Sequence, residues 1–249
     1  MKPLLAHPIL LTVLITALAP ALAQEALMPE DDWVEALRAG GHVELGPGVF
    51  ETSEYVELNR SVTVTGQGSG FTSLWFASDG GEYGEQLALV APESGRARFE
   101  FTGMDISQGS LAPSDLMAVW GDAHLVLTGV SLNFAFDEYD YYEDEWDVWM
   151  GSGLLLGAGA SALVDSSEFH SNSSNGITAL YAERLVVTNS SFHDNAWAGI
   201  YVMDTPLTAS GNYFSMNDVG IEVYGTATRV LVANTFKEQI TVDVYEATE

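Results

Sequence analysis

A dense run of carboxylates near the middle of the chain is the first feature that could carry chemistry. Residues 137–147 place seven Asp or Glu side chains in eleven positions. Carboxylate oxygens suit Ca²⁺, which takes about six to eight oxygen ligands. The aspartates that would form such a site are Asp137, Asp140, Asp144 and Asp147. The run has neither the spaced acidic pattern nor the glycine of an EF-hand loop, so a solvated, self-repelling loop is the alternative.

Aromatic side chains are interleaved with the same carboxylates. Tyr141 and Trp146 are the two that we expect to contact a ligand. An exposed aromatic ring offers a flat apolar face that stacks on a sugar ring or packs on a partner. We therefore interpret residues 134–150 as an acidic insertion loop with a candidate role in binding.

Two histidines follow two phenylalanines at matched places in the sequence. His170 comes after Phe169 and His193 comes after Phe192, with Glu168 and Asp194 close by in the chain. A histidine–carboxylate cluster can perform general acid–base catalysis or bind a metal. No third metal ligand is evident, so a polar surface stripe is the alternative.

A second pair of candidates mixes aromatic and acidic residues. Trp197 and Tyr201 could stack on a sugar, and Glu222 with Asp204 could serve as an acid and a base. The alternative is an ordinary solvated face.

The elements that must position these residues are revealed by a repeat of about 22 residues. Phe169, Phe192, Phe214 and Phe236 are separated by 23, 22 and 22 positions. Gly-Ile pairs recur in the same rhythm at 176–177, 199–200 and 220–221, and Ile240 is expected at the matching place in the last repeat. Polar residues repeat with them, as Asn172, Asn195, Asn217 and Gln239, and as Ser167, Ser190, Asn212 and Asn234. Periods of this length indicate stacked structural units.

The local pattern decides what those units are. Runs such as 200–202 and 221–223 alternate with period 2, which predicts short strands rather than helices. Strands that recur every 22 residues can pair in parallel with the next coil. The Phe and Ile side chains would then stack inside, and the Asn side chains would form ladders in the turns.

Weaker signals extend the same fold upstream and close its first end. Residues 102–106 and 128–132 are matched segments 26 positions apart, and the interval from Leu132 to Phe169 fits one coil plus an insertion. Asp31 or Asp32 can begin a short capping helix that Gly40 ends. Such a cap covers the apolar interior of the first coil. At the far end, Asp243, Glu246 and Glu249 can discourage edge-to-edge pairing.

These segments resemble a known superfamily. Residues 33–76, with Gly-His-Val-Glu-Leu-Gly-Pro-Gly-Val-Phe-Glu at 41–51 and Val-Thr-Val-Thr-Gly-Gln-Gly at 62–68, resemble the opening of pectin-lyase-like proteins. The later repeats are similar to those of NosD-like β-helix proteins. The resemblance implies an all-β fold, a single-stranded right-handed parallel β-helix with a short N-terminal capping helix. It implies little about activity, because fold does not determine function.

Composition limits the partners. The chain has 35 acidic and 8 basic residues and no cysteine. Such a surface repels nucleic acid and anionic membranes and makes a simple polyanion ligand unfavourable. Residues 1–23 have the charged start, apolar run and Ala-Leu-Ala end of a signal peptide. We therefore expect a secreted protein, periplasmic or extracellular. Residues 24–249 should form one domain that does not insert into a membrane.

The enzymes of this superfamily carry signatures that the chain lacks. The Asn-Thr-Asp, Asp-Asp and Arg-Ile-Lys motifs of polygalacturonase-like hydrolases are absent, and no basic residue of the repeats lies beside an evident carboxylate cluster. We therefore predict a non-catalytic binding or structural role at carbohydrate or cell-envelope surfaces, with no cofactor other than a candidate Ca²⁺. The alternatives are a polysaccharide lyase, hydrolase or epimerase, and an accessory subunit of an exported assembly.

Overall fold

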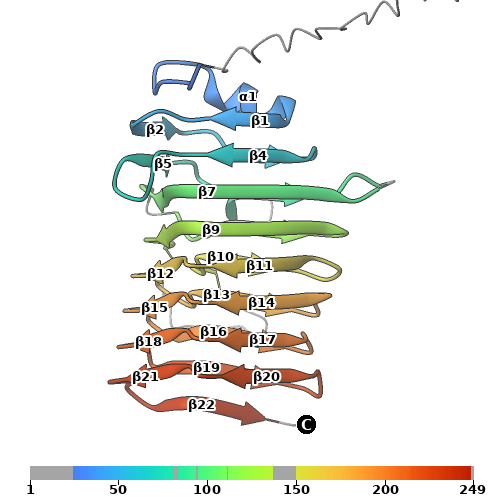
Figure 1. The fold of residues 1–249 in the computed structure, drawn as a ribbon, viewed down its shortest axis with the longest axis vertical. Coiled ribbons are helices and arrows are strands. Elements are labelled where there is room, and N and C mark those ends of the chain that lie inside the picture. Colours follow the sequence, from blue (N-terminus) through green and yellow to red (C-terminus); the bar gives the residue numbers. More distant parts are fainter. Residues whose placement is uncertain (1–24, 81–83, 94, 111, 137–149, 248–249) are drawn as a thin grey trace, which may run out of the picture.

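The chain winds into stacked coils whose strands pair in parallel (Figure 1). The structure, a computed structural model, describes residues 25–80, 84–93, 95–110, 112–136 and 150–247. Within these residues the strands form one sheet of fourteen strands and one of eight. Residues far apart in sequence thus become neighbours along the axis of the stack, as the repeat predicts.

The larger sheet bends around one side of the stack. It consists of β1 (Gly41–Glu44), β2 (Gly48–Thr52), β4 (Val62–Thr65), β5 (Thr72–Phe76), β7 (Ala97–Gln108), β9 (Ala123–Asn133), β11 (Ser161–Asp165), β12 (Glu168–His170), β14 (Arg184–Thr188), β15 (Ser191–His193), β17 (Leu207–Ser210), β18 (Tyr213–Ser215), β20 (Arg229–Val232) and β21 (Thr235–Lys237). The smaller sheet consists of β3 (Val56–Leu58), β6 (Glu85–Val90), β8 (Asp115–Trp120), β10 (Leu154–Leu156), β13 (Ile177–Leu180), β16 (Ala198–Met203), β19 (Val219–Tyr224) and β22 (Val242–Ala247). A helix, α1 (Trp33–Ala39), precedes the first strand.

The bend in the larger sheet has a backbone cause. The long strands β7 and β9 run through it at Gly103 and Gly129, whose φ angles are 64° and 61°. Glycine adopts this left-handed conformation without a steric cost. In the later coils the strand is interrupted at the same place, by Ser166 with φ 51° and Asn189 with φ 50°. The predicted pairing of residues 102–106 with 128–132 is confirmed by the register of β7 against β9.

The phenylalanine stack is also confirmed. Phe169, Phe192, Phe214 and Phe236 are register partners, and successive ring centroids lie 5.0 Å apart. The first three rings are fully buried. They form the apolar centre of the stack, where each additional coil buries further surface.

Asparagine side chains link successive coils in one turn. Asn195 Nδ2 donates to Asn217 Oδ1 at 2.9 Å and to the Phe169 carbonyl oxygen at 3.0 Å, while Asn172 Nδ2 donates to Asn195 Oδ1 at 2.8 Å. Asn172, Asn195 and Asn217 are buried. The ladder therefore satisfies backbone and side-chain groups that have no access to water.

A second ladder follows the other predicted polar positions. The backbone N–H groups of Ser167, Ser190 and Asn212 donate to the side chains of Ser190, Asn212 and Asn234, at 3.1, 2.9 and 3.1 Å. Both ladders serve the fold, because their polar atoms are engaged along the axis rather than toward a ligand.

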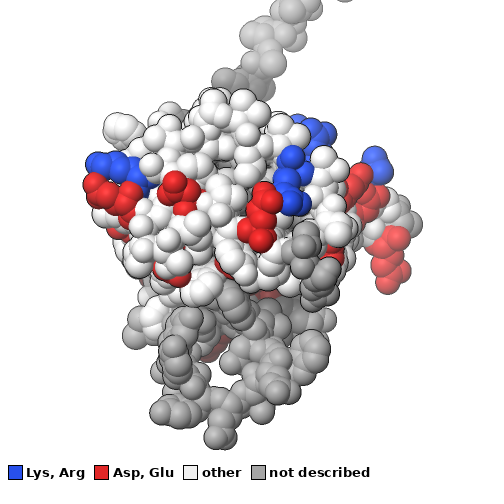
Figure 2. Space-filling view, turned by 90° about the horizontal axis from the view of Figure 1, so that it is seen from below, with Lys and Arg blue, Asp and Glu red and all other residues white. Residues whose placement is uncertain are grey.

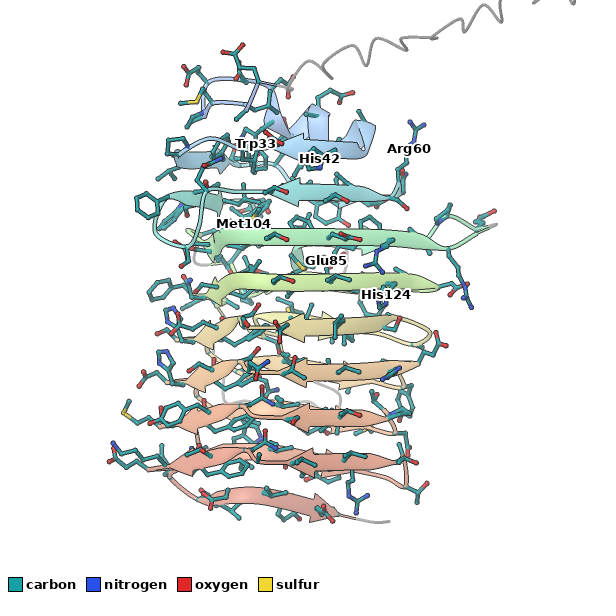
Figure 3. All side chains as sticks on the ribbon, viewed as in Figure 1. Trp33, His42, Arg60, Glu85, Met104 and His124 are labelled. Carbon is teal, nitrogen blue, oxygen red and sulfur yellow. The ribbon has the colours of Figure 1, made fainter. Side chains whose placement is uncertain are left out.

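The helix α1 caps the first coil. Asp32 accepts a hydrogen bond from the Glu35 N–H at 3.1 Å, which is an N-cap, and Gly40 follows the helix with φ 78°. Trp33 packs edge-on against Phe50 and Phe76 with ring centroids 6.1 Å apart in both pairs (Figure 3). The predicted cap is confirmed.

The last coil departs from the predicted register. Val244, not Ile240, is the partner of Ile221, and Ile240 lies outside β22 with 77% of its surface exposed. The interior position follows the phenylalanine by 8, 8 and 7 residues in the three preceding coils, and Val244 follows Phe236 by 8 residues, whereas Ile240 follows it by only 4. The prediction for Ile240 was wrong because this residue comes too early in the repeat and lies in the turn before β22.

Two predicted segments lie outside the described residues. These are the signal peptide, residues 1–23, and all of the acidic insertion except its ends at 134–136 and 150. Of the helices in the described part of the chain, none is long and apolar enough to cross a membrane.

Candidate functional site

The predicted site residues fall into three groups. The insertion residues Asp137, Asp140, Tyr141, Asp144, Trp146 and Asp147 lie outside the described residues. His170 and His193 share one face of the larger sheet, whereas Trp197, Tyr201 and Glu222 share the outer face of the smaller sheet.

Glu222 lies at the centre of the cluster on the smaller sheet. Ile221 and Val223 point into the core, so Glu222 between them points outward, yet only 3% of its surface is exposed. Trp197 Nε1 donates to Glu222 Oε2 at 2.5 Å, and the Tyr224 hydroxyl also donates to this carboxylate. Glu222 thus fixes the orientation of two aromatic side chains.

Three tyrosines follow the axis of the stack beside this carboxylate. The ring centroids of Tyr201 and Tyr224 are 5.6 Å apart, and those of Tyr224 and Tyr245 are 5.9 Å apart. Burial, with the nearby Glu222 charge, raises the pKa of Tyr201 to about 12 and that of Tyr224 to about 12. Both phenols therefore remain neutral hydrogen-bonding groups at physiological pH. We call Trp197, Tyr201, Tyr224 and Tyr245 the aromatic face.

Asp204 lies in a turn, whereas Glu222 lies within β19. Asp204 occupies the turn after β16 with φ 43°, and its Oδ1 accepts a hydrogen bond from the Thr226 N–H at 3.1 Å. Its carboxylate therefore stabilises a turn between coils. The hydrogen bonds of Asp204 and Glu222 go to different groups, and their pairing as acid and base stays a prediction from the sequence.

Tyr224 and Tyr245 were not among the predicted site residues. Tyr245 is the register partner of Glu222. Placing Ile240 in the interior position put Thr241 beside Glu222, four residues too early, and so Tyr245 was missed. The spacing of Tyr201, Tyr224 and Tyr245, at 23 and 21 residues, was the available signal.

The two histidines stack on the larger sheet as predicted neighbours. Their rings are 5.0 Å apart and 1° from parallel. His193 Nε2 lies 2.8 Å from Glu168 Oε1, and His193 Nδ1 lies 2.7 Å from Asp194 Oδ2. His170 Nδ1 lies 3.1 Å from Ser171 Oγ.

The environments of the two rings shift their pKa values in opposite directions. Burial alone would lower the pKa of His193, but hydrogen bonds to Asp194 and Glu168 outweigh it and raise the value. Burial lowers the pKa of His170, and the adjacent His193 adds to that effect. A neutral His170 beside a protonated His193 is the expected state between the two pKa values.

A hollow of about 470 Å³ on the larger sheet was not predicted. The polar residues lining it are Arg96, Asp122, His124, Ser161, Glu183 and Arg184. His124 Nδ1 lies 3.0 Å from Ser161 Oγ, and burial together with the Arg98 charge lowers the pKa of His124 (Figure 3 labels this residue). The mixed charges of the wall leave no strong preference for an anion or a cation. Its residues come from coils separated by the insertion, so no single motif indicated it.

The described residues contain no group of three or more His, Asp or Glu side chains arranged to hold a metal ion. The contacts of His193 with Glu168 and Asp194 are those of an acid–base or structural network. The four insertion aspartates proposed for Ca²⁺ stay a prediction from the sequence.

The coils, the two ladders and the stacked interior define a β-helix protein. Residues 119–239, just under half of the chain, match the family described as a right handed beta helix region. The chain therefore has the right-handed parallel β-helix fold that the sequence predicted.

Solved structures show the same architecture at low sequence identity. An N-terminal fragment of gene product 12 from bacteriophage Phi29 superposes with a TM-score of 0.58 at 14% identity, covering 82% of this chain and 40% of that one. This chain thus spans less than half of that fragment. No curated protein matches the chain.

Two further structures are more distant. The A-module of mannuronan C-5 epimerase AlgE4 from Azotobacter vinelandii has a TM-score of 0.33 at 14% identity, covering 87% of this chain and 93% of that one. PfbA, a surface adhesin of Streptococcus pneumoniae, has a TM-score of 0.27 at 10% identity, covering 88% and 93%.

Proposed function

We propose that this chain is an exported, non-catalytic binding protein whose aromatic face holds a polysaccharide. The observation that carries the proposal is the line of Tyr201, Tyr224 and Tyr245, with Trp197 held beside it by Glu222. Export is inferred from the signal-peptide pattern of residues 1–23.

The spacing of the tyrosines favours an extended ligand. The last three coils of the smaller sheet, those of β16, β19 and β22, contribute one tyrosine each, so a chain-like molecule lying along the axis would meet an aromatic side chain at each of these coils. Rings present apolar faces to sugar C–H groups, and their hydroxyls can hydrogen-bond to sugar hydroxyls.

Charge selects the class of polysaccharide. The chain carries 35 acidic residues against 8 basic ones, so a polyanion would be repelled as it approached. Neutral sugars avoid this penalty. A neutral polysaccharide, free or in a cell envelope, is therefore the ligand that the surface favours.

The state of the carboxylates supports binding over catalysis. Glu222 is buried and accepts hydrogen bonds from Trp197 and Tyr224, while Asp204 accepts one from the backbone of a turn. A glycosidase needs two carboxyl groups that both reach the scissile bond. Here Glu222 positions Trp197 and Tyr224, and Asp204 stabilises a turn.

The test is affinity electrophoresis against a panel of neutral and anionic polysaccharides. Tyr245→Ala should weaken the affinity for a neutral polysaccharide, measured from the retardation, by about tenfold. This change corresponds to the loss of about one stacking contact. Tyr213→Ala is the matched control, because Tyr213 is a comparably exposed tyrosine on the larger sheet. Equal retardation of both variants, or preferential binding of anionic polysaccharides, would contradict the proposal.

The insertion requires its own variant. Deletion of residues 134–150 should abolish Ca²⁺ binding by calorimetry if the aspartates there form a site. Polysaccharide binding that is lost in the same deletion would extend the ligand contacts to Tyr141 and Trp146. Unchanged binding of both ligands would remove the insertion from the function.

An enzyme acting on polysaccharides is the second candidate, favoured by the stacked histidines. A neutral His170 beside carboxylate-bound His193 could accept a proton from a substrate. The assay is product release from the polysaccharide panel, with and without Ca²⁺. Turnover that is lost in His170→Ala or Glu222→Gln would establish an enzyme in place of a binding protein.

A further inference from the structure

The hollow on the larger sheet results from a step in side-chain size between neighbouring coils. Residues 157–161, Gly-Ala-Gly-Ala-Ser, form the turn before β11 and its first residue, and all of their side chains are small. The coils on either side present larger side chains, with His124 near the start of β9 and Arg184 at the start of β14. The three strands begin on the same side of the stack (Figure 1). The coil of β11 is therefore the floor of the hollow, and its two neighbours form the walls.

The distance between the walls suits a molecule of one or two rings. β9 and β14 both pair with β11, so they lie two strand spacings apart, which is about 9–10 Å. The hollow has a volume of about 470 Å³, which is typical of a site for a small ligand.

Two polar side chains meet at the floor of the hollow. Ser161 is the register partner of His124, and Ser161 Oγ lies 3.0 Å from His124 Nδ1. Burial lowers the pKa of His124, and the charge of Arg98 adds to this effect, so the ring is neutral at physiological pH. A neutral imidazole and a serine hydroxyl each contain a donor and an acceptor. The floor therefore offers both kinds of hydrogen-bonding group to a ligand.

The walls carry charges of both signs. Arg96 Nε lies 3.1 Å from Asp122 Oδ2, so these two side chains form an ion pair. On the other wall, Glu183 and Arg184 are exposed, and neither forms an ion pair within the part of the chain that the structure describes. Acidic and basic side chains are also intermixed on the face of the molecule seen in Figure 2. Because the four charges cancel, neither an anion nor a cation gains a net attraction to the hollow.

Apolar side chains lie next to these polar groups. Leu163 and Val186 are register partners on neighbouring strands, and both line the hollow. Leu163 is 38% exposed, so a ligand can reach it. The two side chains form a short apolar strip beside the charged walls.

We propose that the hollow is a second binding site of this protein, which takes a neutral sugar of one or two rings. Sugar hydroxyls donate to the Glu183 carboxylate and accept from the Arg184 guanidinium, because a hydroxyl is both a donor and an acceptor. The C–H groups of the sugar pack on Leu163 and Val186. The site belongs to the larger sheet and shares no residue with the aromatic face, so it is independent of the polysaccharide site proposed there.

The ion pair on one wall favours a neutral sugar over a charged ligand. An anion would compete with Asp122 for Arg96, and a cation would compete with Arg96 for Asp122. Hydroxyl groups can bond to both members of the pair while the pair stays intact.

The first test is the binding of small sugars to the full mature chain, followed by ligand-observed NMR and by titration calorimetry. The neutral ligands are glucose, galactose, mannose and cellobiose, with glucuronate as an anionic comparison and free alanine as a zwitterionic one. At least one neutral sugar should bind with a dissociation constant on the order of 1 mM. Glucuronate and free alanine should bind at least about tenfold more weakly.

Variants of the floor and the wall locate the binding site. Ser161→Phe fills the hollow with a ring and should abolish binding of the small sugar. Ser161→Ala and Arg184→Gln each remove one hydrogen-bonding group and should weaken binding by about tenfold. The matched control is Arg60→Gln, because Arg60 is an exposed arginine outside the hollow and has no ion pair among the described residues. Its affinity should equal that of the wild type.

A variant of the aromatic face separates the two sites. Tyr245→Ala should leave the affinity for the small sugar unchanged, and thermal unfolding should show that every variant compared is folded. If Ser161→Phe does not fold, Ser161→Ala provides the test. The proposal would be overturned by the absence of binding for all four neutral sugars or by tighter binding of glucuronate or free alanine. Unchanged affinity in folded Ser161→Phe and Ser161→Ala, or loss of binding in Tyr245→Ala, would also overturn it.

Discussion

Removal of one rung of the asparagine ladder should reveal how much the polar turns contribute to stability. In Asn195→Ala four side-chain hydrogen bonds disappear: two donated to Phe169 O and Asn217 Oδ1, and two accepted from the backbone and side-chain nitrogens of Asn172. Asn195 is buried, so its former partners cannot turn to water. At about 1 kcal/mol for each bond, the free energy of unfolding should fall by about 4 kcal/mol.

The assay is thermal unfolding followed by circular dichroism. A loss of about 4 kcal/mol corresponds to a fall in melting temperature of about 8–16 °C for a domain of this size. The control is Asn59→Ala, because Asn59 is exposed and should change the melting temperature by less than about 2 °C.

Hydrogen exchange adds a spatial test. Stacked coils contact only their neighbours, so the loss of protection should be greatest in the coils that contain Asn172, Asn195 and Asn217. If Asn195→Ala melts at the temperature of the Asn59→Ala control, the ladder does not stabilise the fold and the reasoning is refuted.

Two other perturbations follow from the structure. In Gly199→Ala the added Cβ would lie 2.7 Å from the carbonyl oxygen of Gly220 in the next coil, so the two coils must separate. The melting temperature should therefore fall by several degrees. An unchanged melting temperature would show that the coils can move apart at low cost. The pKa of His193 is raised in the folded state, so its protonation stabilises the fold. This stabilisation is fully present at pH values below the unfolded-state pKa of about 6.5 and is lost as the pH rises through the folded-state pKa. Urea unfolding at a series of pH values should therefore show a smaller decline in stability for His193→Gln than for the wild type, and identical pH profiles would contradict the assignment.

The repeat was visible in the sequence because each coil places similar residues in similar environments. Phe169, Phe192 and Phe214 fill the same interior position, and Asn172 and Asn195 fill the same turn. A strand needs only alternation to point its side chains in and out, and alternation can be read without coordinates. The architecture, the capping helix and the two ladders followed from these local rules.

The tertiary structure decided which surface residues meet. Turn length sets the register between coils, and the turn before β22 extends past Ile240, so that Tyr245 and not Thr241 lies beside Glu222. Burial of Glu222 and the hydrogen bond that Asp204 accepts from the Thr226 N–H depend on neighbours from other coils. The sequence determined the coil because a coil is made by near neighbours in the chain. The aromatic face is made by residues about 22 positions apart, whose alignment only the folded turns define.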